Sequence, residues 1–290
     1  MTHDPSILFF TDGLAAGELA SFAQRLEILG YEGLWVPEFF GREPFSTVSF
    51  LLANTQRLRV ATGIANVYAR DAIVAAQARQ TLAELSGGRF VLGLGVSHPP
   101  MAEAHGLPWV APLRKMRAYL DTLEATPVQS PPPVEPAPIW IAAHGPLLLK
   151  LAAERAQGAN TYLMPPAHTR MARERLGPGG RLNVVLPSCL CEDAELARRI
   201  ARKALRIYLP LPAYRKQWCD WGFQASDFED GGSDRLVDST VAWGDETKIR
   251  ARMAAHLEAG ASQIAISPLN PEGRGPTPHW KLLEALAPTA

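Results

Sequence analysis

Residues able to do chemistry gather where apolar runs of the sequence end. The acidic side chain among them is Glu38, which follows the run Leu34 to Val36 and is able to act as a general acid or base. The other reading of Glu38 is a solvated loop carboxylate or an ion-pair partner for Arg42 or Arg70. The remaining stretches of this kind are Asn66, Gly95-Val96-Ser97-His98 and Ala143-His144-Gly145-Pro146.

Two of these stretches have the composition of an anion site. Ser97 and His98 follow Gly95 and Val96, and this stretch offers backbone N–H groups and a hydroxyl. Residues 143–146 lead into an expected helix whose first N–H groups and dipole favour a phosphate. Each stretch also fits a plain strand exit, and both histidines also fit capping or packing roles. Together the two stretches favour one phosphate site.

Gly63 interrupts the run RVATGIANVYARD, residues 59–71, whose first half is typical of a buried strand. Glycine weakens a strand interior, so its presence indicates a bulge or a close approach of the backbone to a ligand. The polar end of the run, from Asn66 onward, favours the same interpretation.

Other kinds of site are not supported by the sequence. The histidines show no HExxH or comparable spacing, so we expect no metal site. Serine and histidine do not occur in a nucleophile-elbow context, which argues against hydrolase chemistry.

These stretches need a scaffold that brings strand ends together, and the chain alternates strand-like with helix-like patterns throughout. The expected strands are 7–10, 33–36, 58–65, 89–94, 139–142, 159–163, 182–190 and 263–267. Expected helices include 44–54, 112–124, 147–156 and 194–208, and helices capped by Asp71 and Asp245. Eight βα repeats predict a (β/α)₈ TIM barrel over residues 1–290, with an open doubly wound sheet as the alternative. In such a barrel the active site lies at the carboxyl ends of the strands.

Two segments depart from the alternation. The proline-rich segment 126–138 fits a domain linker or a surface connection, and we favour the connection because the alternation resumes directly after it. The segment 218–243 reads as an irregular insertion, which we expect to serve as a lid.

Bulk properties exclude several classes of protein. Lys and Arg number 29, as do Asp and Glu, so no charge excess favours nucleic acid or an anionic membrane as partner. The sequence lacks an apolar run of the ~20 residues that a membrane span needs and lacks a basic leader at its start. Three cysteines give no disulfide framework. We expect a cytoplasmic protein.

Several blocks of the chain resemble the bacterial luciferase-like superfamily, and in particular its F420-dependent oxidoreductase branch. The blocks are GYEGLWVPE, RVATGIANVYARD, LAELSGGRFVLGLGVSH, APIWIAAHGPLLLKLAAERAQG and GDETKIRARMAAHLEAGASQIAI. The resemblance implies a barrel that binds F420 or FMN at the strand ends and moves a hydride to or from a small organic substrate. It also implies a homodimer.

The resemblance further implies individual roles. Gly63–Ile64 matches a non-proline cis peptide bond in a strand bulge behind the deazaflavin ring, and Asn66 matches a position near that ring. Cofactor phosphate contacts match Ser97, His98 and the turn Ala143 to Pro146, which includes Gly145. Many relatives carry an acidic residue followed by histidine at the Glu38 position, whereas this chain has Phe39 there.

That departure leaves the proton donor open between Glu38 and His144. The function expected from the resemblance is that of an F420-dependent oxidoreductase. The alternatives are an FMN-dependent monooxygenase of the same superfamily and a non-catalytic barrel that only binds the cofactor.

Overall fold

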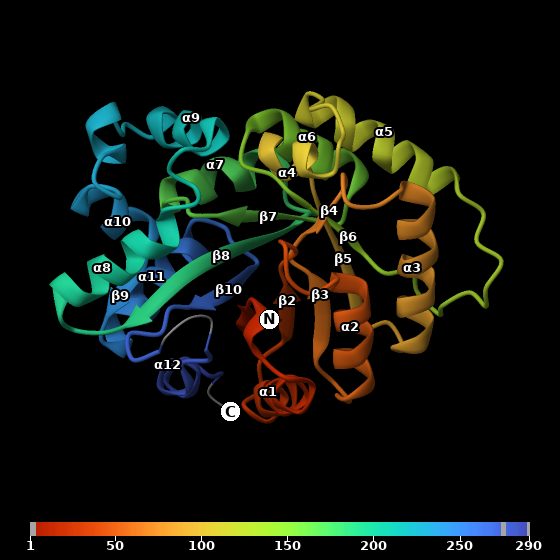
Figure 1. Cartoon of the computed structure of the whole chain (residues 1–290), viewed down its shortest axis with the longest axis horizontal. Helices are drawn as coiled ribbons and strands as arrows, with labels where there is room; N and C mark the ends of the chain where they lie inside the picture. The colour runs from red at the N-terminus through yellow and green to blue at the C-terminus, as the bar shows by residue number, and fades with distance from the viewer. Residues whose placement is uncertain (1–3, 274–276, 289–290) are drawn as a thin grey trace.

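The chain folds into a closed barrel of parallel strands, in a computed structural model that describes residues 4–273 and 277–288. Every strand pair is parallel, and β10 joins both β1 and β8, which closes the sheet. This arrangement confirms the expected (β/α)₈ barrel (Figure 1). The barrel strands are β1 Ser6–Leu8, β2 Gly33–Val36, β3 Arg59–Thr62 with β4 Ala65–Asn66, β5 Phe90–Gly95, β6 Ile139–Ala142, β7 Gly158–Tyr162, β8 Arg181–Leu190 and β10 Gln263–Pro268.

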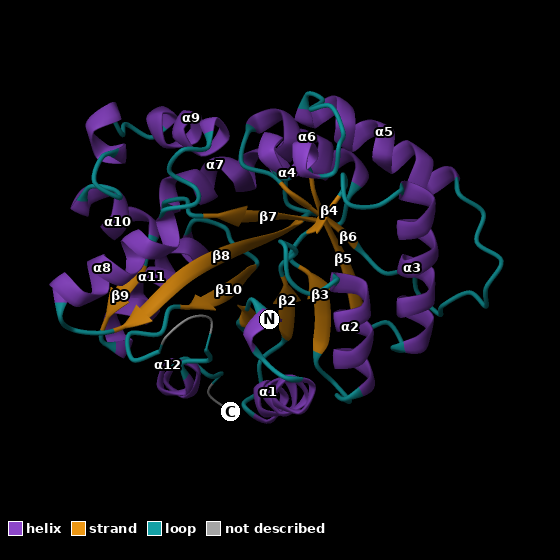
Figure 2. Ribbon diagram, viewed as in Figure 1, coloured by secondary structure: helices purple, strands orange, loops and turns teal. Residues whose placement is uncertain are grey.

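Helices surround the strands (Figure 2). The barrel helices are α1 Ala16–Ile28, α2 Pro44–Ala53, α3 Ala72–Leu85, α5 Pro112–Ala125, α6 Pro146–Arg155, α7 Pro166–Leu176, α8 Ala194–Leu205, α11 Glu246–Glu258 and α12 Trp280–Ala285. Short elements between them are η1 Thr11–Gly13, α4 Pro99–Ala104, α9 Pro212–Asp220, η2 Ala225–Phe228, α10 Asp234–Thr240 and β9 Ala242–Gly244. Helices α4 and α7 were not predicted from the sequence. None of the helices in the described residues is both long and apolar enough to cross a bilayer.

Carboxylate caps begin several of these helices where the sequence predicted them. Asp71 accepts a hydrogen bond from the backbone N–H of Ile73 at 2.7 Å, and Asp245 accepts one from that of Lys248 at 2.8 Å. Such a cap satisfies an N–H group that the helix itself leaves unpaired. Both caps fix where a helix starts after a strand-end loop, and so fix the length of that loop.

The interior of the barrel is filled near its middle by two indole rings. Trp35 on β2 and Trp140 on β6 have ring centroids 5.1 Å apart and pack with Leu8, Val91 and Val185. Alternate residues on the same strands face outward and pack against the helices. The barrel is therefore a packed core rather than a pore, and a ligand site must lie at one end of it.

The two segments that broke the alternation have different outcomes. Residues 126–138 connect α5 to β6, which pairs with β5, so the segment is a connection within the barrel; it forms the long loop at the right of Figure 1. The segment 218–243 is not irregular, since it holds the end of α9, η2, α10 and the start of β9. It belongs to the longer connection between β8 and α11, residues 191–245, which begins with α8. We call residues 206–241 of this connection the β8 excursion.

The β8 excursion has an apolar core of its own, which explains its regular structure. Trp218 is fully buried, and its indole N–H donates to the carbonyl oxygen of Leu163 at 2.9 Å. Phe223, Phe228 and Leu236 pack around it. Sequence periodicity did not predict this core, because its aromatic residues occur at irregular spacing.

Candidate active site

A bulge interrupts the third strand position of the barrel at Gly63. Ala61 pairs with Val91, and Ala65 pairs with Leu94, so four steps along β3 and β4 match three steps along β5. One residue is therefore extra on the bulged strand. The Gly63–Ile64 peptide bond is cis, which confirms the expectation drawn from the resemblance.

Ile64 of the bulge packs beside two small residues of the neighbouring strands, Gly95 and Ala142, and we call the surface formed by these three residues the floor. A β-carbon built on Gly95 would lie 2.5 Å from Cδ1 of Ile64 and 3.4 Å from Cβ of Ala142. Only glycine fits such a contact without displacing Ile64, since carbon atoms prefer separations of about 3.5–4.0 Å. The floor lies at the carboxyl ends of β5 and β6 and directly before β4.

Glu38 follows β2 and is held by an ion pair at the side of the bulge. Both guanidinium N–H groups of Arg70 donate to its carboxylate, at 2.8 and 2.5 Å, and the backbone N–H of Asn66 donates to Oε2 at 2.6 Å. The two side chains of the pair are only 9% and 11% exposed. Burial lowers the pKa of Arg70, but the hydrogen bonds and charge of Glu38 and the charge of Glu43 outweigh it and raise that pKa. Arg70 therefore keeps its positive charge.

Both oxygens of the Glu38 carboxylate are thus engaged and are not available for proton transfer. The sequence allowed two readings of this residue, an acid or base and an ion-pair partner of Arg42 or Arg70. The structure supports the second with Arg70, and this geometry argues against Glu38 as the proton donor.

Asn66 presents an unpaired hydrogen-bond donor beside the bulge. Its Oδ1 accepts from the backbone N–H of Tyr68 at 3.0 Å, which fixes the orientation of the amide. Its Nδ2 atom has no hydrogen-bond partner among the described residues, and water does not reach it, because the residue is only 2% exposed. A buried unpaired donor costs about 1–3 kcal/mol, so this group is suited to a ligand with an acceptor atom.

The two expected anion stretches come together around one tyrosine. The ring of Tyr214 on α9 lies 5.8 Å from that of His98 and 5.1 Å from that of His144. Ser97 has φ 56°, a left-handed conformation that turns the chain sharply after β5. Pro146 is the first residue of α6, and Gly145 before it has no side chain that could cap the first N–H groups of the helix.

The histidines of this region are uncharged at neutral pH. Burial lowers the pKa of His98, and burial together with the charges of His168 and His98 lowers that of His144 to about 3. The Nδ1 atom of His144 is buried without a partner in the part of the chain that the structure describes, and its carbonyl oxygen lies 2.9 Å from Nε2 of His168. An anion here would be held by hydrogen bonds from N–H groups rather than by a fixed positive charge.

Sequence reasoning missed a group of hydroxyls at the end of β7. Tyr162 packs against the barrel interior, and its hydroxyl is hydrogen-bonded to those of Tyr208 and Ser267. Burial raises the pKa of Tyr162 well above its usual value and that of Tyr208 to about 12, so both keep their protons. Tyr162 was detectable from the sequence, because it lies at the end of an expected strand. Tyr208 and Tyr214 were not, because only the fold of the β8 excursion brings them to the site.

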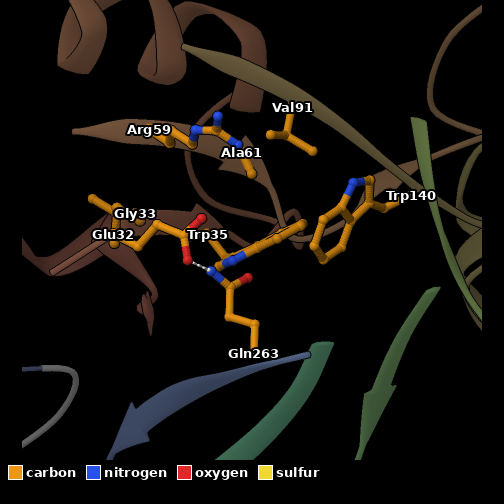
Figure 3. Close-up of a pocket in the computed structure, with 9 residues that line it drawn as sticks. Glu32, Gly33, Trp35, Arg59, Ala61, Val91, Trp140 and Gln263 are labelled. Atoms are coloured by element: carbon orange, nitrogen blue, oxygen red, sulfur yellow. Dashed lines mark hydrogen bonds between the residues drawn. The ribbon is translucent and has the colours of Figure 1, made fainter. Parts of the chain in front are cut away.

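A cavity at the opposite end of the barrel is not part of this site. It lies beneath Trp35 and Trp140 and is bordered by Glu32, Arg59 and Gln263 at the amino ends of strands (Figure 3). Its volume of about 20 Å³ suits roughly one water molecule. Gln263 donates to Glu32 there at 2.6 Å. Polar contacts at this end of a barrel serve stability rather than catalysis.

Comparison with known proteins identifies the family. The model of the luciferase-like monooxygenase family matches residues 10–263. The chain belongs to the luciferase-like monooxygenase family.

Individual proteins of known sequence or structure are also similar to this chain. The 5,10-methylenetetrahydromethanopterin reductase of Methanolobus tindarius is 25% identical over 88% of this chain and 91% of its own length. A Mycobacterium tuberculosis protein provisionally classed as a coenzyme F420-dependent oxidoreductase is 30% identical over 70% of this chain, which matches 55% of that relative's length. The solved coenzyme F420-dependent tetrahydromethanopterin reductase of Methanopyrus kandleri aligns with a TM-score of 0.74 at 17% identity, over 99% and 98% of the two chains.

In this luciferase-like protein the predicted site residues form two neighbouring groups. Glu38, Gly63, Ile64 and Asn66 surround the bulge. Ser97, His98, Ala143, His144, Gly145 and Pro146 lie at the ends of β5 and β6, beneath α9. The floor joins the groups, since Gly95 contacts Ile64. In the described residues, no cluster of three or more His, Cys, Asp or Glu side chains is placed to hold a metal ion.

Proposed function

We propose that the protein is an F420-dependent oxidoreductase that moves a hydride between the deazaflavin and a small organic substrate. The observation that carries this proposal is the bulge with its floor, where Ile64 packs on Gly95 and Ala142, and its unpaired Asn66 donor, at the catalytic end of the barrel. The F420-dependent relatives named above support the choice of cofactor. An FMN-dependent monooxygenase is the second candidate, because the description of the family itself favours it.

The residues present fit a flat heteroaromatic ring with a phosphate-bearing chain. Gly63 and Ile64 would back the ring, and the Nδ2 atom of Asn66 would donate to a ring acceptor. The phosphate would lie among Ser97, His98 and the residues 143–146, where backbone N–H groups and the α6 dipole are available. When bound, the deazaflavin supplies or accepts the hydride, and the protein orients it and excludes water.

Proton transfer falls to groups other than Glu38. The imidazole of His144 is the candidate proton acceptor when a substrate is oxidised, because its Nδ1 atom has no partner within the described chain. Burial lowers its pKa, which makes it a weak base. The Tyr162 hydroxyl keeps its proton and is able to donate it when a substrate is reduced. We therefore retain His144 from the sequence prediction and add Tyr162.

We further propose that residues 1–290 act as one domain and that the β8 excursion is the lid over the site. Tyr214 supports the second point, since it joins α9 to both phosphate-binding stretches. The same proposal places a homodimeric enzyme in the cytoplasm, acting on small molecules rather than on nucleic acid. Light scattering coupled to size-exclusion chromatography tests the dimer.

Titration of the purified protein with F420 and, separately, with FMN tests the function. We expect F420 to bind, with a change in its fluorescence, and FMN to bind more weakly. Binding of FMN alone, with oxygen consumption in the presence of reduced FMN, would replace the proposal by the monooxygenase. Binding of F420 without turnover in a broad screen of alcohols, ketones and enones would favour a non-catalytic barrel.

A further inference from the structure

The bulge breaks the backbone ladder between the second and third strand positions, so that β4 does not pair with β2 in the described sheet. The last ladder hydrogen bond runs from the N–H of Gly63 to the carbonyl oxygen of Val36 at 2.7 Å. Beyond it, β4 pairs with β5, including the N–H of Val67 with the carbonyl oxygen of Gly95 at 3.0 Å. The N–H of Asn66 points away from β5 and needs another acceptor.

The Glu38 carboxylate supplies that acceptor in place of a strand carbonyl. Its Oε2 lies 2.6 Å from the Asn66 nitrogen, which is short enough for a charge-assisted hydrogen bond. A carboxylate with 9% exposure is costly to bury unless its charge is compensated. Arg70 provides the compensation through a two-pronged contact, which a single ammonium group does not reproduce.

Arg70 is itself fixed from two further directions. Its guanidinium carbon lies 4.8 Å from the ring centroid of Phe45, and Nη2 contacts Oε1 of Glu43 at 3.2 Å. Glu43 also caps α2 through the N–H groups of Phe45 and Ser46. The guanidinium therefore links β4 to the end of β2 and to the start of α2. Arg70 also lies directly before the cap of α3, so the same contacts hold the start of that helix.

We propose that Arg70 is a positioning residue that acts through Glu38 and Asn66. The Glu38–Arg70 pair sets the backbone of Asn66, and thereby aims the unpaired donor of this network, Nδ2, at an acceptor atom of the bound cofactor ring. The inference rests on the proposed function for the identity of that ligand. It changes the role of Glu38 from acid or base to the acceptor that replaces a missing strand.

A double-mutant cycle in F420 affinity tests the coupling. N66S keeps an acceptor for the Tyr68 N–H but removes the buried amide, and we expect it to weaken F420 binding about fivefold. R70M is expected to weaken binding to a similar extent, and the double variant N66S/R70M no further, because the donor is already misplaced. R155M is the matched control, since Arg155 at the end of α6 makes a two-pronged contact with Glu124 on α5, at 3.4 and 2.8 Å, outside both the bulge and the β8 excursion. We expect R155M to bind F420 as the wild type does.

Two results would overturn the inference. One is an R70M protein with a lowered melting temperature but unchanged F420 affinity, which indicates a role in stability alone. The other is independent, additive losses from N66S and R70M. If R70M does not fold, E38L/R70M takes its place, because an apolar pair leaves no uncompensated buried charge.

Hydrogen exchange separates failure of the inference from failure of the proposed function. If the wild type does not bind F420, the proposed function is wrong, and the positioning role is then judged on the protein alone. We expect amide exchange over residues 63–69 to be at least about tenfold faster in E38L/R70M than in the wild type or R155M. Unchanged exchange in that segment would contradict the role assigned to Arg70.

Discussion

Substitution of Gly95 by alanine tests whether the floor faces the cofactor. The new β-carbon would lie 2.5 Å from Cδ1 and 2.6 Å from Cγ1 of Ile64, about 1 Å closer than a comfortable carbon contact. Ile64 must therefore move, and we expect it to move away from Gly95 and towards the proposed ring. The perturbation thus displaces the residue proposed to back the ring.

The expected loss of stability is modest. Overpacking of this kind costs about 1–3 kcal/mol, and replacing glycine by alanine recovers about 0.4–1 kcal/mol by restricting the unfolded chain. The net decrease in the free energy of unfolding is about 0.5–2 kcal/mol, which lowers the melting temperature by roughly 2–5 °C in a protein of this size. Affinity for F420 is expected to fall further, by roughly tenfold, because the floor itself is displaced.

Thermal unfolding and fluorescence titration with F420 give the two readouts. G179A is the control for adding a methyl group, since a β-carbon there meets nothing of the described chain within 4 Å. I64A/G95A removes the overlap and should recover part of the lost affinity. A G95A protein that binds F420 as tightly as the wild type, with the expected loss of stability, would refute the placement of the ring against this floor.

Three further outcomes are expected from the same geometry. G93A should prevent folding or destabilise severely, since its β-carbon would lie 2.0 Å from the carbonyl oxygen of Thr62 in the rigid sheet; a well-folded G93A protein in circular dichroism would contradict this close packing of β3 on β5. Burial, with the charges of Arg252 and His168, lowers the pKa of His256 to about 3, so unfolding takes up a proton as pH falls below about 6.5 and stability should drop from there towards pH 3. H256N keeps an acceptor or donor for Thr169 and should show a shallower decrease in melting temperature between about pH 7.5 and 5, whereas parallel curves would argue against a buried neutral His256. W218A should cost about 3–5 kcal/mol and expose the β8 excursion to limited proteolysis, while W218F should lose only about 1 kcal/mol with the indole hydrogen bond; equal protection in both variants would show that Trp218 does not anchor the excursion.

The barrel was predictable from the sequence because its signals are local. Alternating apolar runs, the caps Asp71 and Asp245, and the glycine in the third strand each depend on a few neighbouring residues. The bulge at Gly63 was predictable for the same reason, since a glycine inside a strand usually marks a bulge or a close approach of the backbone. The β8 excursion was not predictable, because its aromatic residues pack on Leu163 and Met164, and Leu163 lies 55 residues before Trp218.

The sequence by itself determined the scaffold, the family and the strand ends that carry polar residues. The tertiary structure decided what those residues do. The sequence favoured Glu38 as an acid or base over an ion-pair partner, and only the position of Arg70, 32 residues later, distinguishes the two. Asn66 became a candidate donor only because the fold pairs its oxygen and buries its nitrogen without a partner among the described residues. The physical reason is that strand periodicity is a short-range property, whereas hydrogen-bond pairing and burial depend on groups that folding brings together.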